Sequence, residues 1–276
     1  MEIRHNKLNT TSTEEFAKSI RLKTLEMVYK AKASHVGGAL SMVDLLAVLY
    51  AKILKYNPQE PKWPDRDRFL LSKGHACASL YATLALLGFF DAADLENYGH
   101  DGSIFLTHAS HKIPGVEIST GSLGHALPVG CGMALAAMRK NEKHRIFVLL
   151  SDGELDEGSN WEAFLFAPKH KLDNLTVIID YNKIQSLGNV KDVLDLEPMV
   201  SKLRAFNWET IEIDGHDHDQ IFNALVTIPK QKEKPTAIIA HTIKGKGVDF
   251  MENNLLWHYK SPSKKELEDA IKQLGA

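Results

Sequence analysis

The chain has 276 residues, of which 44% are hydrophobic and 25% are charged, and its formal net charge is -2. The near balance of 33 basic and 35 acidic side chains argues against a nucleic-acid-binding protein, and no apolar run reaches the roughly 18 residues of a membrane span. The N-terminus resembles no signal peptide or organelle leader, so we expect a soluble, cytoplasmic protein with one domain over residues 1–276, of which residues 1–12 form an N-terminal arm.

Apolar periodicity predicts helices and strands along the whole chain. Ser12 followed by Glu15 indicates a capping box that opens a helix ending near Lys32, and Ser41 is expected to cap a helix over 42–54. The later elements are a strand at 69–72, helices at 75–87, 92–98 and 124–140, a strand at 146–150, a helix at 159–170, a strand at 176–180, a helix at 196–205, a strand at 210–213, a helix at 218–228, a strand at 237–241 and a capped helix at 263–274. This alternation predicts an α/β protein whose parallel sheet carries helices on both faces.

Polar residues follow two of these strands at their carboxyl ends, where open α/β sheets bind ligands. Asp152 and Gly153 follow one strand and Asn182 follows the next, so neighbouring parallel strands would bring Asp152 and Asn182 together although they lie 30 positions apart. Carboxylate and amide oxygens suit Mg²⁺ or Ca²⁺. Gly153 would let an anion approach the backbone near a helix N-terminus. Each residue alone is also typical of an ordinary turn or cap.

Five segments in order resemble one protein family. SDGELDEG and DYNKI, 22 residues apart, resemble the thiamine-diphosphate motif, with Ser151 in place of its first glycine. The other segments resemble motifs of the transketolase family, and they are ASHVGGALS (33–41), DRDRFLLSKGHA (65–76), FLTHASHKIPGVEISTGSLGHALPVGCGMA (105–134) and AHTIKGKGVDFMENNLLWH (240–258). Thr107 and Tyr259 depart from glycines that the family usually has. The resemblance covers about residues 13–260.

The resemblance implies a thiamine-diphosphate-binding fold and a set of site residues. The metal ligands would be Asp152, Asn182 and the carbonyl of Ile184, holding Mg²⁺, with Ca²⁺ as the alternative. The cofactor-binding residues would be Gly121, Leu123, Gly153, Glu154, Glu157, Asn182 and Lys244, with Gly153 and Glu154 beside the diphosphate. The catalytic residues would be His35, His75, His108 and His258, which would polarise sugar oxygens and move protons. Glu157 and Glu162 resemble a carboxylate relay between active sites, and solvated helix acids are the alternative.

Two other patterns are interpreted as structural. Cys77 and Cys131 lie in apolar helical patterns, which predicts buried, reduced thiols. DGHDHD at 214–219 follows a strand and precedes a helix, so His218 is interpreted as part of a turn and helix cap. A His216 that faces the cofactor pocket is the alternative at that position.

The leading functional hypothesis is the N-terminal subunit of a two-chain transketolase. It would use Mg²⁺ and thiamine diphosphate to transfer a two-carbon ketol unit from a ketose phosphate to an aldose phosphate. Only 18 residues follow His258, so a companion chain with the pyrimidine-binding and C-terminal domains would complete the site in a heterotetramer. The alternatives are the alpha subunit of a 2-oxo-acid dehydrogenase, an enzyme of the deoxyxylulose-phosphate synthase type, a non-catalytic cofactor-binding scaffold, and a piece of a longer enzyme.

Overall fold

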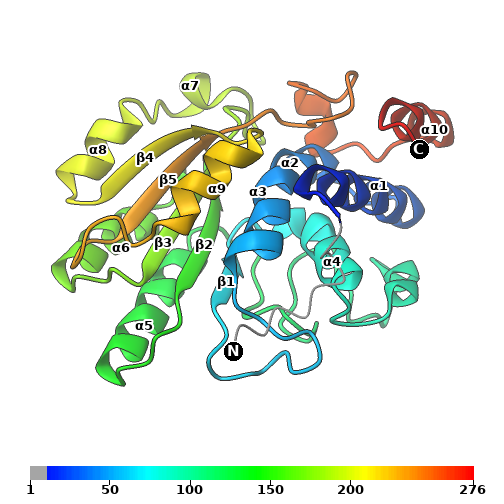
Figure 1. Ribbon diagram of the computed structural model, residues 1–276. Helices are drawn as coiled ribbons and strands as arrows, with labels where there is room; N and C mark the ends of the chain where they lie inside the picture. Colours follow the sequence, from blue (N-terminus) through cyan, green and yellow to red (C-terminus); the bar gives the residue numbers. More distant parts are fainter. Residues whose placement is uncertain (1–10) are drawn as a thin grey trace.

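A five-stranded parallel sheet forms the centre of the computed structural model, which describes residues 11–276 (Figure 1). Most of the expected N-terminal arm, residues 1–10, lies outside the described residues. The strands are β1 (Arg68–Leu71), β2 (Ile146–Ser151), β3 (Leu175–Tyr181), β4 (Glu209–Asp214) and β5 (Thr236–His241). They follow the order β1-β2-β3-β5-β4, and every neighbouring pair is parallel. The predicted parallel sheet is therefore confirmed.

Helices precede, connect and follow these strands. They are α1 (Thr13–Ala31), α2 (Val36–Ser41), α3 (Val43–Val48), the π-helical turn η1 (Leu49–Ile53), α4 (Cys77–Leu86), α5 (Ala126–Arg139), α6 (Gly158–Lys169), α7 (Val190–Val193), α8 (Met199–Ala205), α9 (His218–Val226) and α10 (Lys264–Gln273), with 3₁₀ turns η2 (Gly74–Ala76), η3 (Ala92–Asn97), η4 (Gly153–Asp156) and η5 (Leu255–His258). Ser12 caps α1, and Ser263 forms the expected capping box with Glu266. Within residues 11–276, each helix is too short or too polar to cross a bilayer.

The prediction of one helix over 42–54 with Ser41 as its cap is wrong. Ser41 is instead the last residue of α2, and the chain continues as α3 and then as the π-helical turn η1. The Ser41 hydroxyl contacts the Gly38 carbonyl and the Asp180 carboxylate. Because this buried hydroxyl is hydrogen-bonded to Asp180, Ser41 does not cap a following helix.

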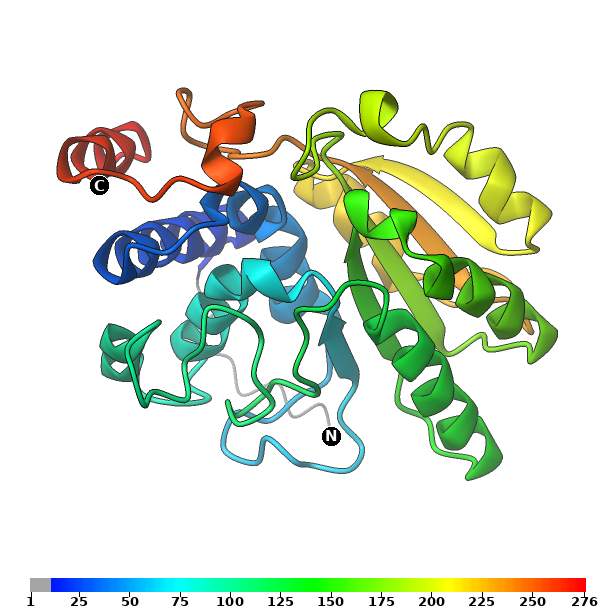
Figure 2. The same cartoon turned by 180° about the vertical axis from the view of Figure 1, so that it is seen from behind.

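Helices cover both faces of the sheet, as Figures 1 and 2 show from opposite sides. On one face, Val148 and Leu150 of β2 pack with α5, α6 and α8. On the other face, Phe147 and Leu149 pack with α1 to α4 and α9. Strands buried on both faces are apolar at successive positions, which is why they appear in the sequence as continuous apolar runs.

The two cysteines lie within this helical packing. Cys77 and Cys131 are buried and free, as the sequence predicted. Burial raises the pKa of each thiol to about 12, so both remain protonated at neutral pH.

The carboxyl ends of β2, β3 and β5 are level with one another. Ser151 of β2 pairs with Asp180 of β3, and Asp180 pairs with Ala240 of β5. The segments that follow these three strands therefore leave the sheet at the same edge. This alignment positions the site described next.

Candidate functional site

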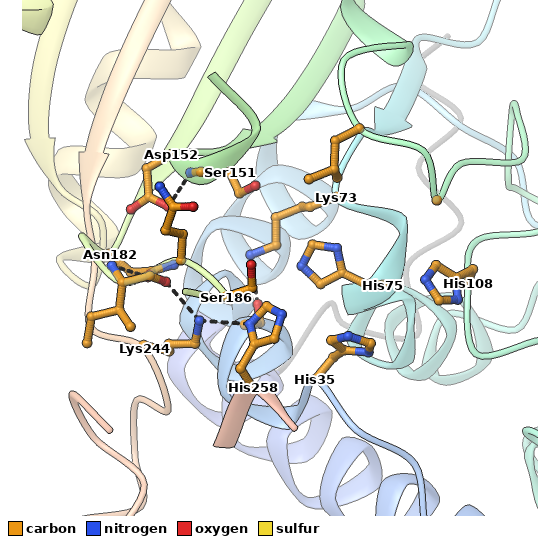
Figure 3. A pocket seen from close by; sticks show the side chains of 16 residues that line it. His35, Lys73, His75, His108, Ser151, Asp152, Asn182, Ser186, Lys244 and His258 are labelled. Carbon is orange, nitrogen blue, oxygen red and sulfur yellow. Dashed lines mark hydrogen bonds between the residues drawn. The ribbon is translucent and has the colours of Figure 1, made fainter. Parts of the chain in front are cut away.

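A cavity of about 240 Å³ opens at the carboxyl edge of the sheet, and Figure 3 shows the side chains around it. Its walls come from the segments after β1, β2, β3 and β5, together with the start of α2, part of the 108–123 segment, and η5. All the predicted catalytic, metal and cofactor residues line this cavity except Glu154 and Glu157. The fold thus gathers residues that lie far apart in the sequence.

Three groups whose oxygens could bind a metal form one side of the cavity, here called the oxygen wall. They are the Asp152 carboxylate, the Asn182 amide and the Ile184 carbonyl. Asp152 is 1% exposed and accepts hydrogen bonds from the backbone N–H groups of Gly153 and Lys183. The Asn182 side-chain oxygen accepts the Ile184 N–H at 3.2 Å. These bonds to backbone groups fix the side chains of Asp152 and Asn182 at the ends of β2 and β3.

The electrostatics of the oxygen wall fit a cation. Burial raises the pKa of Asp152 to about 6, and the nearby charge of Asp180 acts in the same direction. A divalent cation would compensate this buried negative charge, and hard oxygen ligands are those that Mg²⁺ prefers. The Ile184 carbonyl already accepts a hydrogen bond from the Lys244 ammonium at 2.8 Å, so it faces positive charge in this structure. The residues present therefore fit a magnesium ion.

Four imidazole rings form the other side, here called the histidine wall (Figure 3). The ring centroid of His35 lies 5.0 Å from that of His75, 5.0 Å from that of His258 and 5.9 Å from that of His108. His35 has a left-handed backbone with φ of 70°, and its N–H donates to the His258 carbonyl at 2.9 Å. This bond ties the segment before α2 to η5 and brings the rings together.

The histidine wall is neutral at pH 7. Burial, helped by the charges of neighbouring groups, lowers the pKa of His35 to about 4 and that of His258 to about 3. Burial also lowers the pKa values of His75 and His108. The Lys244 ammonium can only donate to His258 Nδ1, 3.0 Å away, so the proton of this ring is on Nε2. Neutral imidazoles can donate to, or accept from, the oxygens of a bound ligand.

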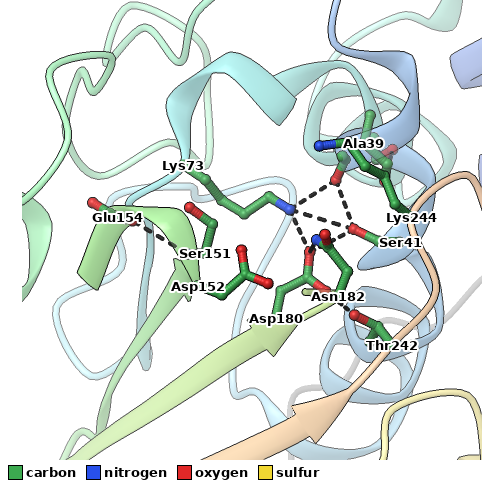
Figure 4. A network of polar contacts seen from close by, with 12 residues as sticks. Ala39, Ser41, Lys73, Ser151, Asp152, Glu154, Asp180, Asn182, Thr242 and Lys244 are labelled. Carbon is green, nitrogen blue, oxygen red and sulfur yellow. Dashed lines mark hydrogen bonds and ion pairs between the residues drawn. The ribbon is translucent and has the colours of Figure 1, made fainter. Parts of the chain in front are cut away.

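A buried ion pair that sequence reasoning missed lies at the cavity floor (Figure 4). The Lys73 ammonium contacts the Asp180 carboxylate, and the side chains of both residues are almost completely buried. Ser41 and Thr242 also donate to Asp180. Burial alone would raise the pKa of Asp180, but these donors, chiefly Lys73, hold it below its usual value. Lys73 follows the end of β1, so its place after a strand is the signal that could have identified it.

Two further cavity residues, Gln185 and Ser186, follow Asn182 and were also not predicted. A side chain at Gly153 would place its Cβ only 2.6 Å from the Gln185 Cβ, so the close approach of these two segments requires glycine. The Tyr259 hydroxyl donates to the Ser186 carbonyl at 2.7 Å. Tyr259, which stands where the family usually has glycine, thus ties the cavity rim to the segment that carries His258.

Two acidic residues expected at the cofactor, Glu154 and Glu157, and the expected relay residue Glu162 lie outside the cavity lining. Glu154 is fully buried, and its carboxylate accepts bonds from Ser72, the Gly124 N–H and the Ser151 N–H. These bonds join β1 and the segment before α5 to the end of β2, so the carboxylate has a structural role instead of facing a diphosphate. Glu157 and Glu162 are exposed, before and on α6.

Gly121 and Leu123 line the cavity beside His108. A Cβ on Gly121 would lie 3.1 Å from His108 Cδ2, so a side chain here would press on that ring. Their segment packs tightly on η2, because a Cβ on Gly74 would lie 2.2 Å from the Thr120 carbonyl oxygen. Gly74 is therefore required where the loops that carry His75 and His108 meet.

The DGHDHD segment lies outside the cavity. Asp217 caps α9, and His218 is the first residue of that helix, which confirms the prediction of a turn and cap. The alternative, a His216 that faces the cavity, is wrong because both imidazoles bond to the buried Asp44 carboxylate.

Comparison with known proteins gives consistent similarities. The family model described as "Transketolase, thiamine diphosphate binding domain" matches residues 12–276. The chain is 41% identical over 255 residues to a protein from Phocaeicola vulgatus that is named as a subunit of an apulose-4-phosphate transketolase. The match covers 92% of this chain and 91% of that protein. It is 40% identical over 259 residues to "6-deoxy-6-sulfo-D-fructose transketolase subunit SqwG" of Clostridium sp., and this match covers 94% of each chain.

Longer transketolases match over less than half of their length. Human transketolase is 35% identical over 262 residues, which are 95% of this chain but 42% of the human protein. The crystal structure of transketolase from Campylobacter jejuni superposes with a TM-score of 0.90 at 35% identity, again over 95% of this chain and 42% of that one. The similarity thus includes the fold and the sequence together.

Proposed function

This chain belongs to the transketolase family, and we propose that it is the N-terminal subunit of a two-chain transketolase. In this proposal it binds Mg²⁺ and thiamine diphosphate and transfers a two-carbon ketol unit from a ketose phosphate to an aldose phosphate. The observation that carries the proposal is the meeting of the oxygen wall and the histidine wall in one cavity. One wall suits a metal diphosphate and the other suits a sugar.

The two walls have different tasks. Asp152, Asn182 and the Ile184 carbonyl would hold Mg²⁺ against the diphosphate, with the Lys244 ammonium nearby as a further positive charge. Gly121 and Leu123 would support the aminopyrimidine ring. Thiamine diphosphate, when bound, supplies the electron sink for cleavage of the carbon–carbon bond beside a ketose carbonyl.

The histidine wall would bind the sugar and move its protons. Its rings are neutral at pH 7 and lie within 6 Å of His35, so they can accept a hydroxyl proton or donate to a carbonyl oxygen without an added charge. His258 would act as a donor through Nε2, because Lys244 occupies its other nitrogen. Four such groups around one cavity favour turnover over a scaffold that only binds the cofactor.

A companion chain is part of the proposal. Relatives of matching length are named as subunits, whereas this chain covers 42% of human transketolase. We propose that the companion contributes the pyrimidine-binding and C-terminal domains, and that two copies of each chain form a closed heterotetramer. The exposed carboxylates of Glu157 and Glu162 would then form a relay between active sites at the assembled interface.

The test is to purify this chain alone, and together with the product of a neighbouring gene that resembles the remainder of a transketolase. Ketol transfer is assayed with Mg²⁺ and thiamine diphosphate, and mass in solution is measured. We expect turnover only from the two chains together, at the mass of a heterotetramer. Substantial turnover by this chain alone would refute the two-chain proposal. Cofactor binding by the assembly without transfer from any ketose phosphate would instead favour a scaffold.

A further inference from the structure

A further buried carboxylate, Asp44 of α3, lies outside the cavity where α1, α3 and α9 meet. Arg21 donates to both its oxygens, at 3.0 and 2.6 Å. His216 contacts it at 2.7 Å and His218 at 3.0 Å. Burial alone would raise the pKa of Asp44, but these hydrogen bonds and the Arg21 charge hold it well below its usual value. The carboxylate is therefore a permanent negative charge that orients three side chains.

Two of those three side chains also bind the backbone of a single turn. The His216 Nε2 accepts the Ile243 N–H at 2.8 Å, and Arg21 Nε donates to the Lys246 carbonyl at 3.1 Å. Because the Ile243 N–H can only donate, the His216 proton must be on Nδ1, where it is donated to Asp44. Asp44 thus holds both ends of the turn over 243–246 through the side chains of His216 and Arg21.

Lys244 lies between those two ends. Lys244 is 2% exposed, and its ammonium donates to the Ile184 carbonyl at 2.8 Å and to His258 Nδ1 at 3.0 Å. It therefore contacts the oxygen wall and the histidine wall at once. A backbone shift of about 1 Å would break one of these contacts, because hydrogen bonds with a nitrogen donor are about 2.7–3.2 Å long and a contact of about 3.6 Å is no longer one.

We propose that Asp44, acting through Arg21 and His216, is a positioning residue that sets the place of Lys244 between the two walls. These three residues are called the Asp44 clamp. The inference rests on the proposed function, which assigns the cavity to the cofactor and provides the two-chain assembly used in the test. His218 is outside the clamp because, among the described residues, its hydrogen bond reaches Asp44 and not the turn.

The neighbouring histidines give a matched pair for testing this. The side chains of His216 and His218 are 12% and 11% exposed, and both bond to Asp44. If the cluster served only to stabilise the fold, replacing either ring would have a similar effect. If it positions Lys244, only the His216 variant should alter the cavity.

The experiment uses the assembled two-chain enzyme and the variants His216→Ala, His218→Ala, Lys244→Met and the double variant with His216→Ala and Lys244→Met. The dissociation constant for thiamine diphosphate is measured at saturating Mg²⁺, and kcat and KM are measured separately. We expect Lys244→Met to change the dissociation constant, kcat or KM by about tenfold or more. His216→Ala should change the same constant in the same direction. His218→Ala should stay within about twofold of the wild type, and the double variant should be no worse than Lys244→Met alone.

Independent losses that add in the double variant, or equal effects of His216→Ala and His218→Ala, would overturn the proposal. Urea unfolding of each assembly checks that the variants are folded. His216→Gln guards against a poorly folded alanine variant, because its side-chain NH₂ can donate to Asp44 while its side-chain oxygen accepts the Ile243 N–H. It should restore the altered constant to within about threefold of the wild type, and a folded variant without that recovery counts against the clamp.

Hydrogen exchange provides a readout that does not involve the cofactor. In the cofactor-free assembly, exchange of the Ile243 amide should be faster in His216→Ala than in the wild type, and unchanged in His218→Ala. Unchanged exchange in His216→Ala would overturn the clamp. A wild-type assembly that fails to bind thiamine diphosphate would refute the proposed function, and this measurement would still decide whether the clamp holds the turn.

Discussion

The oxygen wall and the histidine wall border the same cavity, but the chain builds them in different ways. Asp152 and Asn182 follow neighbouring strands whose register places Ser151 opposite Asp180, so the sheet itself fixes their distance. The histidine wall takes its rings from four separate segments, joined by bonds such as that from the His35 N–H to the His258 carbonyl. One wall is a property of the sheet, and the other depends on how loops pack around it.

The two walls also differ in charge. Burial makes the Asp152 carboxylate costly and favours a bound cation, whereas burial of the histidines favours their neutral form. The cavity therefore separates a side for holding a metal diphosphate from a side for exchanging protons. Substitutions on the first side should affect binding, and substitutions on the second should affect turnover.

The largest effect is expected on the oxygen wall. Asp152→Ala or Asn182→Ala should abolish magnesium-dependent binding of thiamine diphosphate while the fold remains intact, because each removes a hard oxygen ligand. Titration calorimetry on the assembled enzyme measures this. Asn189→Ala, which removes an exposed amide bonded to Asp192, is the control and should bind normally. Unchanged affinity in both test variants would contradict the metal assignment.

The histidine wall should respond in the opposite way. His75→Ala or His258→Ala should lower kcat by about 10²–10⁴, the range typical of acid–base residues, with the affinity for thiamine diphosphate nearly unchanged. His111→Ala is the control, because His111 is exposed and contacts Ser119 outside the cavity. A rate of ketol transfer within about twofold of the wild type in His258→Ala would show that this ring has no catalytic role.

A smaller effect, on stability, should follow from breaking the ion pair at the cavity floor. Lys73→Met leaves the buried Asp180 carboxylate without its ammonium, which should lower the free energy of unfolding by about 3–5 kcal/mol. Lys30→Met removes one partner of the exposed pair with Glu96 and should cost about 0–1 kcal/mol. Urea unfolding compares the two. Equal losses would mean that the buried Lys73 pair contributes no more to stability than the exposed one.

The smallest effect is a dependence on pH that comes from the histidine wall. The pKa of His35 is about 4 in the folded chain, against an ordinary value of 6.5, so only the unfolded chain binds this proton between those values. The free energy of unfolding should therefore fall as the pH is lowered from 6.5 towards 4. Urea unfolding at several pH values should show a shallower fall for His35→Gln. An identical slope in that variant would contradict the assignment.

Local patterns predicted the sheet and the closeness of Asp152 and Asn182, because apolar runs, turns and strand ends depend on neighbouring residues. The Ile184 carbonyl was predicted only through the resemblance to a family. The predicted helix over 42–54 failed because the Ser41 hydroxyl bonds to Asp180, far away in the sequence. The Lys73 pair and the Asp44 clamp were missed for the same reason, since both join distant residues that no periodicity links. The histidine wall was predicted only through resemblance to a family, because no local signal in the sequence brings His35 and His108 together.

The order of strands in the sheet has a consequence for folding kinetics. Pairing β1 with β2 joins Arg68 to Ile146, whereas pairing β2 with β3 joins Ile146 to Leu175. The longer closure costs about 0.9 kcal/mol more chain entropy by the logarithmic dependence on loop length, and non-local parallel pairing is slow. The long connection between β1 and β2 contains both His75 and His108. We therefore expect β2 to pair with β3 before β1 joins the sheet.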